Sequence, residues 1–477
     1  MALALILIPL LFAALVFALP SERWRPWLVP MGGATHLTLV VLALRRTDVT
    51  AFGGWVLLDP LGRLILGLLS LLFFLCALYV PGYLALRRDR SNRIFCTCLL
   101  AFLGTMTLMT ASHHLGLMWV ALEATTLASA PLLYFNRNQR SLEATWKYLL
   151  IGSVGIALAL LGSLFLAYSA FRAGLDTSLL FDDLIRDAPQ LSRPWLHSAF
   201  VLLFVGYGTK MGLAPMHTWK PDAYGESPGV VGALLAGGLT NCAFLALLRF
   251  YQICAAAGEA AFVREIMVVI GLLSMAVAGV FMARQQDFKR LLAYSSVEHM
   301  GILVLGMGIG GAAVFGVLLH LVNNALTKGV LFLSAGNIHR AYDSKLTTHV
   351  SGALRRVPVS GALFLAGFFA ITGSPPFGVF LSEFIILRAA IDSDQFLIAG
   401  FFLAMLFVVF VGMGATVLSV VQGEPPKDLP PNAYHDSFLM VAPAIACLAL
   451  VLLLGLYIPP PINGLLQDAA NFLDGTP

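Results

Sequence analysis

Long apolar runs separated by short polar segments occupy the chain from Ala2 to Ile458. Most runs hold roughly 20 residues, which is the length an α-helix needs to cross a hydrocarbon core of about 30 Å. The pattern therefore predicts about fourteen membrane spans. They are expected at Ala2–Pro20, Pro26–Leu44, Leu61–Leu86, Ile94–Ser112, Leu115–Phe135, Tyr148–Phe171, Trp195–Met216, Val230–Tyr251, Phe262–Ala283, Leu291–Gly310, Ala312–Gly336, Val357–Ile391, Phe396–Val421 and Phe438–Tyr457.

Two of these spans contain residues that break helices. The seventh, Trp195–Met216, holds Pro215 behind three glycines, and the twelfth, Val357–Ile391, holds Pro375 and Pro376. Proline lacks the backbone N–H that a helix interior needs, so we expect a break at both places. Interrupted spans in corresponding positions are typical of inverted-repeat transporters whose working residues lie near the midplane. Ordinary proline kinks in a static bundle are the alternative interpretation.

The predicted fold is an all-α polytopic membrane protein with two inverted five-helix repeats, each containing one broken helix. Residues 1–93 would form the first three spans, and residues 94–251 the first repeat. Residues 252–421 would form the second repeat, and residues 422–477 the last span and a tail.

The composition agrees with a chain that lies in a lipid bilayer. Of its 477 residues, 59% are hydrophobic and 11% charged, which leaves too little polar surface to cover a water-soluble globule. The first apolar run lacks the basic start of a signal peptide and is taken as a span. None of the six cysteines forms a C-x-x-C pair, so the sequence favours neither a metal site nor an iron–sulfur site. No cofactor is expected in this chain.

Positive charges are distributed unevenly between the two sides of the expected membrane. Eighteen of the 29 Lys and Arg residues, Lys220 among them, fall in loops after odd-numbered spans. Because cytoplasmic loops are enriched in Lys and Arg, these loops are expected in the cytoplasm and both termini outside it. Lys210 and Lys328 are expected to be the two lysines inside apolar spans, where an ammonium costs at least ~2.5 kcal/mol unless it is paired, hydrated or functional.

Acidic residues and histidines also lie inside the expected spans. Glu123, Glu298 and Glu383 have mostly apolar neighbours, and His299 and His320 lie in the same kind of surroundings. Burial disfavours the charged form of such groups, so acids, lysines and histidines held close together can exchange protons near neutral pH. These residue types on several spans predict a proton relay. A polar stripe that only holds helices together by hydrogen bonds is the alternative interpretation.

The eleventh span, Ala312–Gly336, shows the spacing most clearly. His320, Asn324 and Lys328 are four residues apart and therefore share one helix face. His320 and Lys328 would lie about 12 Å apart along the helix axis, too far for direct proton transfer. Ordered water, oriented by Asn324, would close this distance.

Three segments resemble those of a known family. They are Gly208–Ala223, Asp287–Gly301 and Lys328–Gly336. Over nearly its whole length the chain resembles the antiporter-like membrane subunits shared by respiratory complex I, membrane-bound hydrogenases and Mrp-type cation/proton antiporters. The Ser-Val-Glu-His-Met-Gly string that ends at Gly301, together with Glu383, looks most like the hydrogenase-4 and formate hydrogenlyase branch.

The resemblance implies a role for the buried ionisable residues. Glu123 and Lys210 would form the charge pair of the first half-channel. Lys328 with His320 would form the centre, and Glu383 would end the second half. In the family these groups lie in a hydrated polar axis at mid-membrane depth, driven by a neighbouring subunit with redox chemistry.

Three positions depart from the family pattern. Asn241 and Asn324 stand where some relatives carry a bridging lysine and a second histidine, and Lys220 stands where leucine is usual. Because asparagine cannot change its protonation state, water or Glu298 would have to complete the path, with His299 beside it.

The leading hypothesis is a proton-translocating subunit of a redox-driven membrane complex, which moves H⁺, with Na⁺ as the alternative ion. By the resemblance, its partners would be other membrane subunits and a cytoplasmic redox module, in the cytoplasmic (inner) membrane of a bacterium or archaeon. One alternative is an Mrp-type antiporter or inorganic-carbon uptake subunit without redox chemistry. Another is a structural scaffold with a relic channel. Catalysis in this chain is not expected, because the sequence shows no nucleophile with a matched base and no cluster of metal ligands. A nucleic-acid partner is not expected either.

Overall fold

The computed structural model describes residues 1–46, 48–427 and 434–475, and these residues are mostly helical. A π-turn at Leu235–Leu239 joins α10 to α11, and short 3₁₀ turns lie at Phe52–Gly54, Tyr134–Asn136 and Ala188–Gln190. Within the described residues the α-helices are α1 (Ala2–Ala18), α2 (Arg25–Leu44), α3 (Pro60–Ala85), α4 (Arg93–Ala111), α5 (Leu115–Leu133), α6 (Gln139–Arg172), α7 (Phe181–Asp187), α8 (Arg193–Met211), α9 (Trp219–Glu226), α10 (Gly229–Leu234), α11 (Thr240–Ala256), α12 (Ala260–Met282), α13 (Phe288–Ile309), α14 (Ala313–Tyr342), α15 (Ala353–Arg356), α16 (Pro358–Ile371), α17 (Gly378–Asp392), α18 (Phe396–Val421), α19 (Phe438–Leu456) and α20 (Pro460–Asp474).

Eleven helical segments of the described chain are long and apolar enough to cross a membrane, with α10 and α11 counted as one. They coincide with eleven of the expected spans. The other three expected spans correspond to the 17-residue helix α1, to α8 with the break that follows it, and to the broken pair α16/α17; helix α9 lies beyond the expected end of the seventh span. The all-α membrane fold and both breaks are therefore confirmed. The count of fourteen and the inverted symmetry of the repeats stay predictions.

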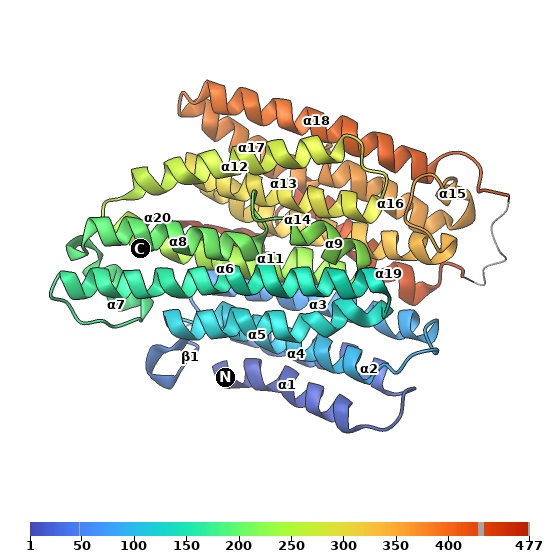
Figure 1. Ribbon diagram of the computed structural model, residues 1–477, viewed down its shortest axis with the longest axis horizontal. Coiled ribbons are helices and arrows are strands. Elements are labelled where there is room, and N and C mark those ends of the chain that lie inside the picture. The colour runs from blue at the N-terminus through green and yellow to red at the C-terminus, as the bar shows by residue number, and fades with distance from the viewer. Residues whose placement is uncertain (47, 428–433, 476–477) are drawn as a thin grey trace.

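The long helices lie roughly parallel to one another along the longest axis of the molecule (Figure 1). In this view α1, α2, α4 and α5 lie at one side of the bundle, and α12, α17 and α18 lie at the other. The markers for the two chain ends lie in the same half of the picture. Helices of the two halves of the chain also lie side by side, because α3 packs against α19 and α10 packs against α14.

Helices α13 and α14 form part of the buried centre of the bundle. In the most apolar 18-residue stretch of α13 every residue is buried, and in α14 94% are, against 28% in the outer helix α18. Glycines allow the close approach of neighbouring helices, because a Cβ added at Gly301 of α13 would lie only 2.8 Å from the carbonyl oxygen of Gly271 in α12. Side chains on α13 and α14 are therefore shielded from lipid.

Two elements were not expected from the sequence. Strands β1 (Thr50–Ala51) and β2 (Val56–Leu57) form an antiparallel hairpin between α2 and α3. The segment after Tyr457, interpreted as part of a tail, forms α20. Leu466, Ala469 and Leu473 of α20 are buried, a spacing that places one apolar face against the bundle.

Candidate functional site

The break between α8 and α9 positions Lys210. Gly212 ends α8 with a φ of +80°, and the peptide bond Ala214–Pro215 is cis. Helix α9 then begins at Trp219, whose Nε1 donates a hydrogen bond to the carbonyl oxygen of Thr209 at 2.9 Å. Lys210 therefore lies in the last turn of α8, where the negative end of the helix dipole favours a cation.

The break between α16 and α17 positions Glu383 in a matching way. Gly373 has a φ of +65°, and the peptide bond Pro375–Pro376 is cis. A Cβ added at Gly373 would overlap the carboxylate of Glu383, so this carboxylate lies against the break itself. Glu383 belongs to the second turn of α17, close to the positive end of that helix dipole.

Lys210 and Glu123 are joined through one hydroxyl group. Lys210 Nζ donates to Thr126 Oγ1, which donates to Glu123 Oε2 at 3.3 Å. The hydroxyl of Tyr148 lies 3.3 Å from Lys210 Nζ. Lys210 is 1% exposed, whereas Glu123 is half-buried and accepts a second hydrogen bond from Ser153 at 3.3 Å. Glu123 and Lys210, both in the described chain, are therefore connected by a polar bridge and not by a direct ion pair.

Lys328 lies fully buried at the centre of the bundle. Its Nζ donates to Ser295 Oγ at 2.8 Å. Glu298 lies three residues after Ser295 and therefore shares its face of α13. Glu298 Oε2 is buried with no hydrogen-bond partner among the described residues, and Glu298 and Lys328 are close enough to attract each other. The centre thus holds one acid and one base without a direct contact.

Two histidines lie next to Glu298. They extend the row of ionisable side chains formed by Lys328 and Glu298. His299 Nδ1 lies 3.0 Å from His320 Nε2, and His320 Nδ1 lies 3.0 Å from Ser382 Oγ. His299 Nε2 lies 3.8 Å from Glu298 Oε2. The structure therefore brings Glu298, His299 and His320 together, and it offers a path across α13 beside the expected path along α14, which stays a prediction.

The same two histidines and Glu383 form a compact group. One ligand atom from each of the three lies within 4.8 Å of the others, and all three side chains are buried. Glu383 Oε1 has no hydrogen-bond partner among the described residues. Two imidazoles and a carboxylate are ligand types that a divalent metal accepts, and they are also groups that exchange protons. The hydrogen bond between the imidazoles already engages one nitrogen of each ring.

The two asparagines lie in different surroundings. Asn241 Nδ2 donates to the carbonyl oxygen of Gly237 in its own helical segment at 2.8 Å, and its Oδ1 is buried without a partner in the described chain. Both polar side-chain atoms of Asn324 are buried without such a partner. A buried amide normally satisfies its hydrogen-bonding groups, so Asn324 is suited to binding ordered water.

Two further lysines, which the sequence placed in loops, are buried as well. Lys220 is 0% exposed and Lys289 is 2% exposed. Lys220 was counted as a loop residue because it follows Pro215 and precedes Pro221 in the sequence. The chain re-enters the bundle after the break, so α9 carries Lys220 inward. A helix break deep inside a span is the signal that could have revealed this.

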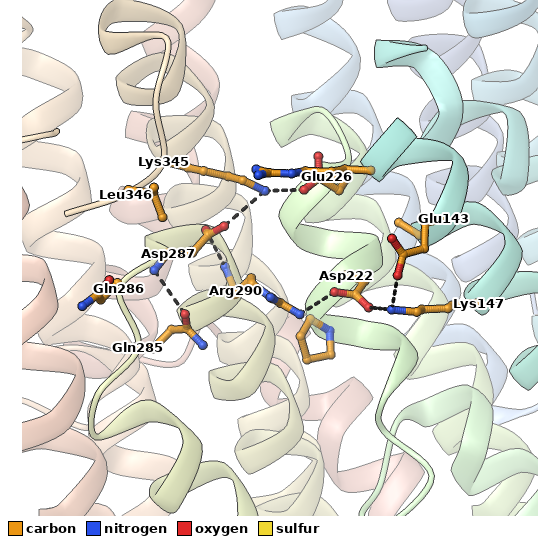
Figure 2. Close-up of a pocket in the computed structure, with 13 residues that line it drawn as sticks. Glu143, Lys147, Asp222, Glu226, Gln285, Gln286, Asp287, Arg290, Lys345 and Leu346 are labelled. Atoms are coloured by element: carbon orange, nitrogen blue, oxygen red, sulfur yellow. Dashed lines mark hydrogen bonds and ion pairs between the residues drawn. The ribbon is translucent and has the colours of Figure 1, made fainter. Parts of the chain in front are cut away.

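A charged pocket of about 530 Å³ lies beside α9 and is lined by Asp222 and Glu226 of this helix (Figure 2). Asp222 of α9 pairs with Lys147 at 2.8 Å and with Arg290. Lys345 pairs with Glu226 at 2.6 Å. Asp222 lies two residues after Lys220, so the pocket reaches the helix that carries this buried lysine. It lies on the side of the loops that are expected in the cytoplasm.

One buried ion pair lies apart from this row. Arg249 of α11 is 1% exposed, and its NH1 lies 2.5 Å from Oδ2 of Asp59. Asp59 also accepts a hydrogen bond from the backbone N–H of Gly62 at 2.7 Å and so caps α3. The paired geometry and the cap indicate that Arg249 fastens α11 to α3.

Comparisons with known proteins agree with this arrangement. Residues 112–408 match the family described as "NADH:quinone oxidoreductase/Mrp antiporter, TM". The chain is 34% identical to the hydrogenase-4 component F homolog of Methylacidiphilum infernorum, over 98% of this chain and 99% of that one. A chain of respiratory complex I from Thermus thermophilus with bound aureothin has a TM-score of 0.79 at 26% identity, with 96% and 97% covered. A chain of the Mrp complex from Dietzia sp. has a TM-score of 0.88 at 19% identity, with 100% and 98% covered, which is a likeness of fold.

Proposed function

The chain belongs to the NADH:quinone oxidoreductase/Mrp antiporter transmembrane family, and from this premise we propose that it is a proton-translocating, antiporter-like membrane subunit of a redox-driven complex. Protons would move along the buried row of ionisable side chains. The repeats at residues 94–251 and 252–421 would each supply one half-channel, and the breaks at Pro215 and at Pro375 and Pro376 would place the working residues near mid-membrane.

One observation supports this proposal most strongly. Ionisable groups from five different spans, all of them buried except the half-buried Glu123, have hydroxyl groups or one another as neighbours. Each such group is costly to insert into a membrane, so a row of them indicates function. The members are Glu123, Lys210, Lys328, Glu298, His299, His320 and Glu383.

The chain is a multi-pass membrane protein, and its structural neighbours come from an Mrp complex and respiratory complex I. We propose other membrane subunits as its direct partners and, through them, a cytoplasmic redox module. Its place would be the cytoplasmic membrane, with both termini outside the cytoplasm. In this proposal the chain itself holds no cofactor, and the redox reaction occurs in a partner.

The test begins with isolation of the tagged chain from its native membranes in a mild detergent. Co-purifying subunits are identified by mass spectrometry, and the intact complex is reconstituted into vesicles. Proton uptake is then measured while the partner's redox reaction runs. We expect redox subunits in the preparation and proton uptake that an uncoupler abolishes.

Two results would contradict the proposal. Only antiporter-type subunits, together with Na⁺/H⁺ exchange that needs no electron donor, would indicate an Mrp-type function. A redox-active complex without any ion movement would indicate a scaffold.

A further inference from the structure

A third ammonium group lies between the two lysines that the sequence singled out. Lys220 of α9 is fully buried, and its Nζ donates a hydrogen bond to Ser296 Oγ at 3.2 Å. The preceding residue, Ser295, accepts a hydrogen bond from Lys328 Nζ at 2.8 Å. Two lysines from different helices therefore reach neighbouring hydroxyl groups on α13.

Lys220 also contacts the segment that follows α8, the helix that carries Lys210. A Cβ added at Gly212 would lie 2.8 Å from Lys220 Nζ, so the side chain of Lys220 lies against the backbone two residues beyond Lys210. The hydrogen bond from Trp219 Nε1 to the carbonyl oxygen of Thr209 ties these segments together at 2.9 Å. Lys220 therefore lies between the helix end that carries Lys210 and the serine pair that meets Lys328.

In the described chain, Lys220 lacks the kind of partner that stabilises the other buried cations Lys289 and Arg249. Among the described residues no carboxylate lies within ion-pair distance of Lys220, and the charged group that acts on it is Lys328, which has the same sign. By contrast, Lys289 Nζ donates to the carbonyl oxygen of Ser227 at 2.6 Å, and Arg249 pairs with Asp59. A buried ammonium without a counter-ion is costly as a cation, so its neutral form is accessible.

We propose that Lys220 is an additional proton-binding site that passes protons between the half with Lys210 and the half with Lys328. The proposal rests on the proposed function. In the proposed step the Lys220 ammonium gives one proton to the Ser296 hydroxyl, an ordered water passes one on to the Ser295 hydroxyl, and the neutral amine of Lys328 takes one up. Each hydroxyl accepts one proton and gives one, so an N–H bond breaks at Lys220, another forms at Lys328, and no electron moves.

The test compares Lys220→Met and Lys220→Arg in the intact complex, reconstituted into vesicles. We expect proton uptake per electron to fall at least about tenfold in both variants, because loss of a positioned proton-transfer group has effects of this size or larger. Arginine keeps the charge but does not release a proton, so it separates a proton carrier from a structural cation. Lys289→Met is the matched control: it should lower the amount of assembled complex while each assembled complex pumps normally.

If the Lys220 variants assemble poorly, the variant Ser296→Ala tests the same proposal without changing Lys220. This variant removes only the hydroxyl partner, and we expect proton uptake per electron to fall about threefold, since a water molecule replaces a hydroxyl relay incompletely. Normal pumping by Lys220→Arg, or by Ser296→Ala, would overturn the Lys220 site while the proposed function stood. A wild-type complex that pumps no protons would overturn the proposed function, and the Lys220 site with it.

Discussion

The two halves of the buried row differ in their exposure, although each is built at a helix break. In the first half Lys210 ends α8, and the half-buried Glu123 on α5 is reached through Thr126. In the second half the buried Glu383 lies against its break and near two imidazoles. The glycines at both breaks have positive φ values, and both are followed by a cis X–Pro bond.

This difference in exposure indicates which half another subunit must cover. A carboxylate that is only half-buried at membrane depth is costly when it faces lipid. We therefore expect another membrane subunit to cover the flank of α5 and α6 around Glu123. In the second half the described residues of this chain bury Glu383, His299 and His320, so this half is sealed by the chain alone.

The largest expected effect is a loss of stability when the structural ion pair of Arg249 and Asp59, which lies outside the row, is broken. Arg249→Met should destabilise the folded chain by about 3–5 kcal/mol, because it leaves the buried carboxylate of Asp59 without its arginine partner. The amount of assembled complex and its melting temperature measure this loss. The double variant Arg249→Met with Asp59→Asn should recover much of it, and every assembled complex should pump normally. A pumping defect in stable double-variant complexes would place this ion pair in the ion path.

The next effect compares the two acids at the ends of the row. Glu383→Gln should lower proton uptake per electron at least about tenfold, because it removes the carboxylate that lies against the helix break, and the other buried carboxylate of this half of the row, Glu298, belongs to a different helix. Glu123→Gln should lower uptake only about threefold, because water or a neighbouring subunit can reach its half-buried position. The measurement is dye-reported acidification of vesicles that contain the intact complex. Equal losses in the two variants would remove the distinction between an open and a sealed half.

The smallest effect concerns the hydroxyl bridge in the first half. Thr126→Val keeps the shape of the side chain but removes the link between Lys210 and Glu123, so uptake should fall about twofold. Thr126→Ser keeps the hydroxyl and should pump at a nearly normal rate. An unchanged rate in the valine variant would show that protons pass between Lys210 and Glu123 by another route.

Most of the fold could be predicted from the sequence because lipid imposes a simple rule. A span needs about 20 apolar residues, and the backbone within it must satisfy its own hydrogen bonds. The positions of both breaks followed from the chemistry of glycine and proline. The hairpin between α2 and α3 and the helix α20 were missed. They depend on contacts with distant segments, such as the hydrogen bond from Gln252 Nε2 to the carbonyl oxygen of Phe472 at 2.8 Å.

The candidate site could be predicted only in part. Lys210, Lys328 and Glu383 stand out because charges are rare within apolar runs. Lys220 did not, because two prolines near it resemble those of a loop. The hydroxyl partners Thr126 and Ser295 were also missed, since Ser and Thr are common in membrane helices and spacing along one helix does not reveal contacts with another.

Proton uptake by complexes with a substituted Lys328 tests the central claim most directly. Lys328→Ala should greatly reduce pumping, while the complex still assembles and the partner's redox reaction largely continues. Lys328→Arg keeps a positive charge beside Ser295 but does not release a proton near neutral pH, so it should also fail to pump. The measurement is uptake per electron in vesicles, with the subunit content of each preparation checked by gel. Loss of pumping in the arginine variant is the result that the account predicts, and full pumping in that variant would contradict it.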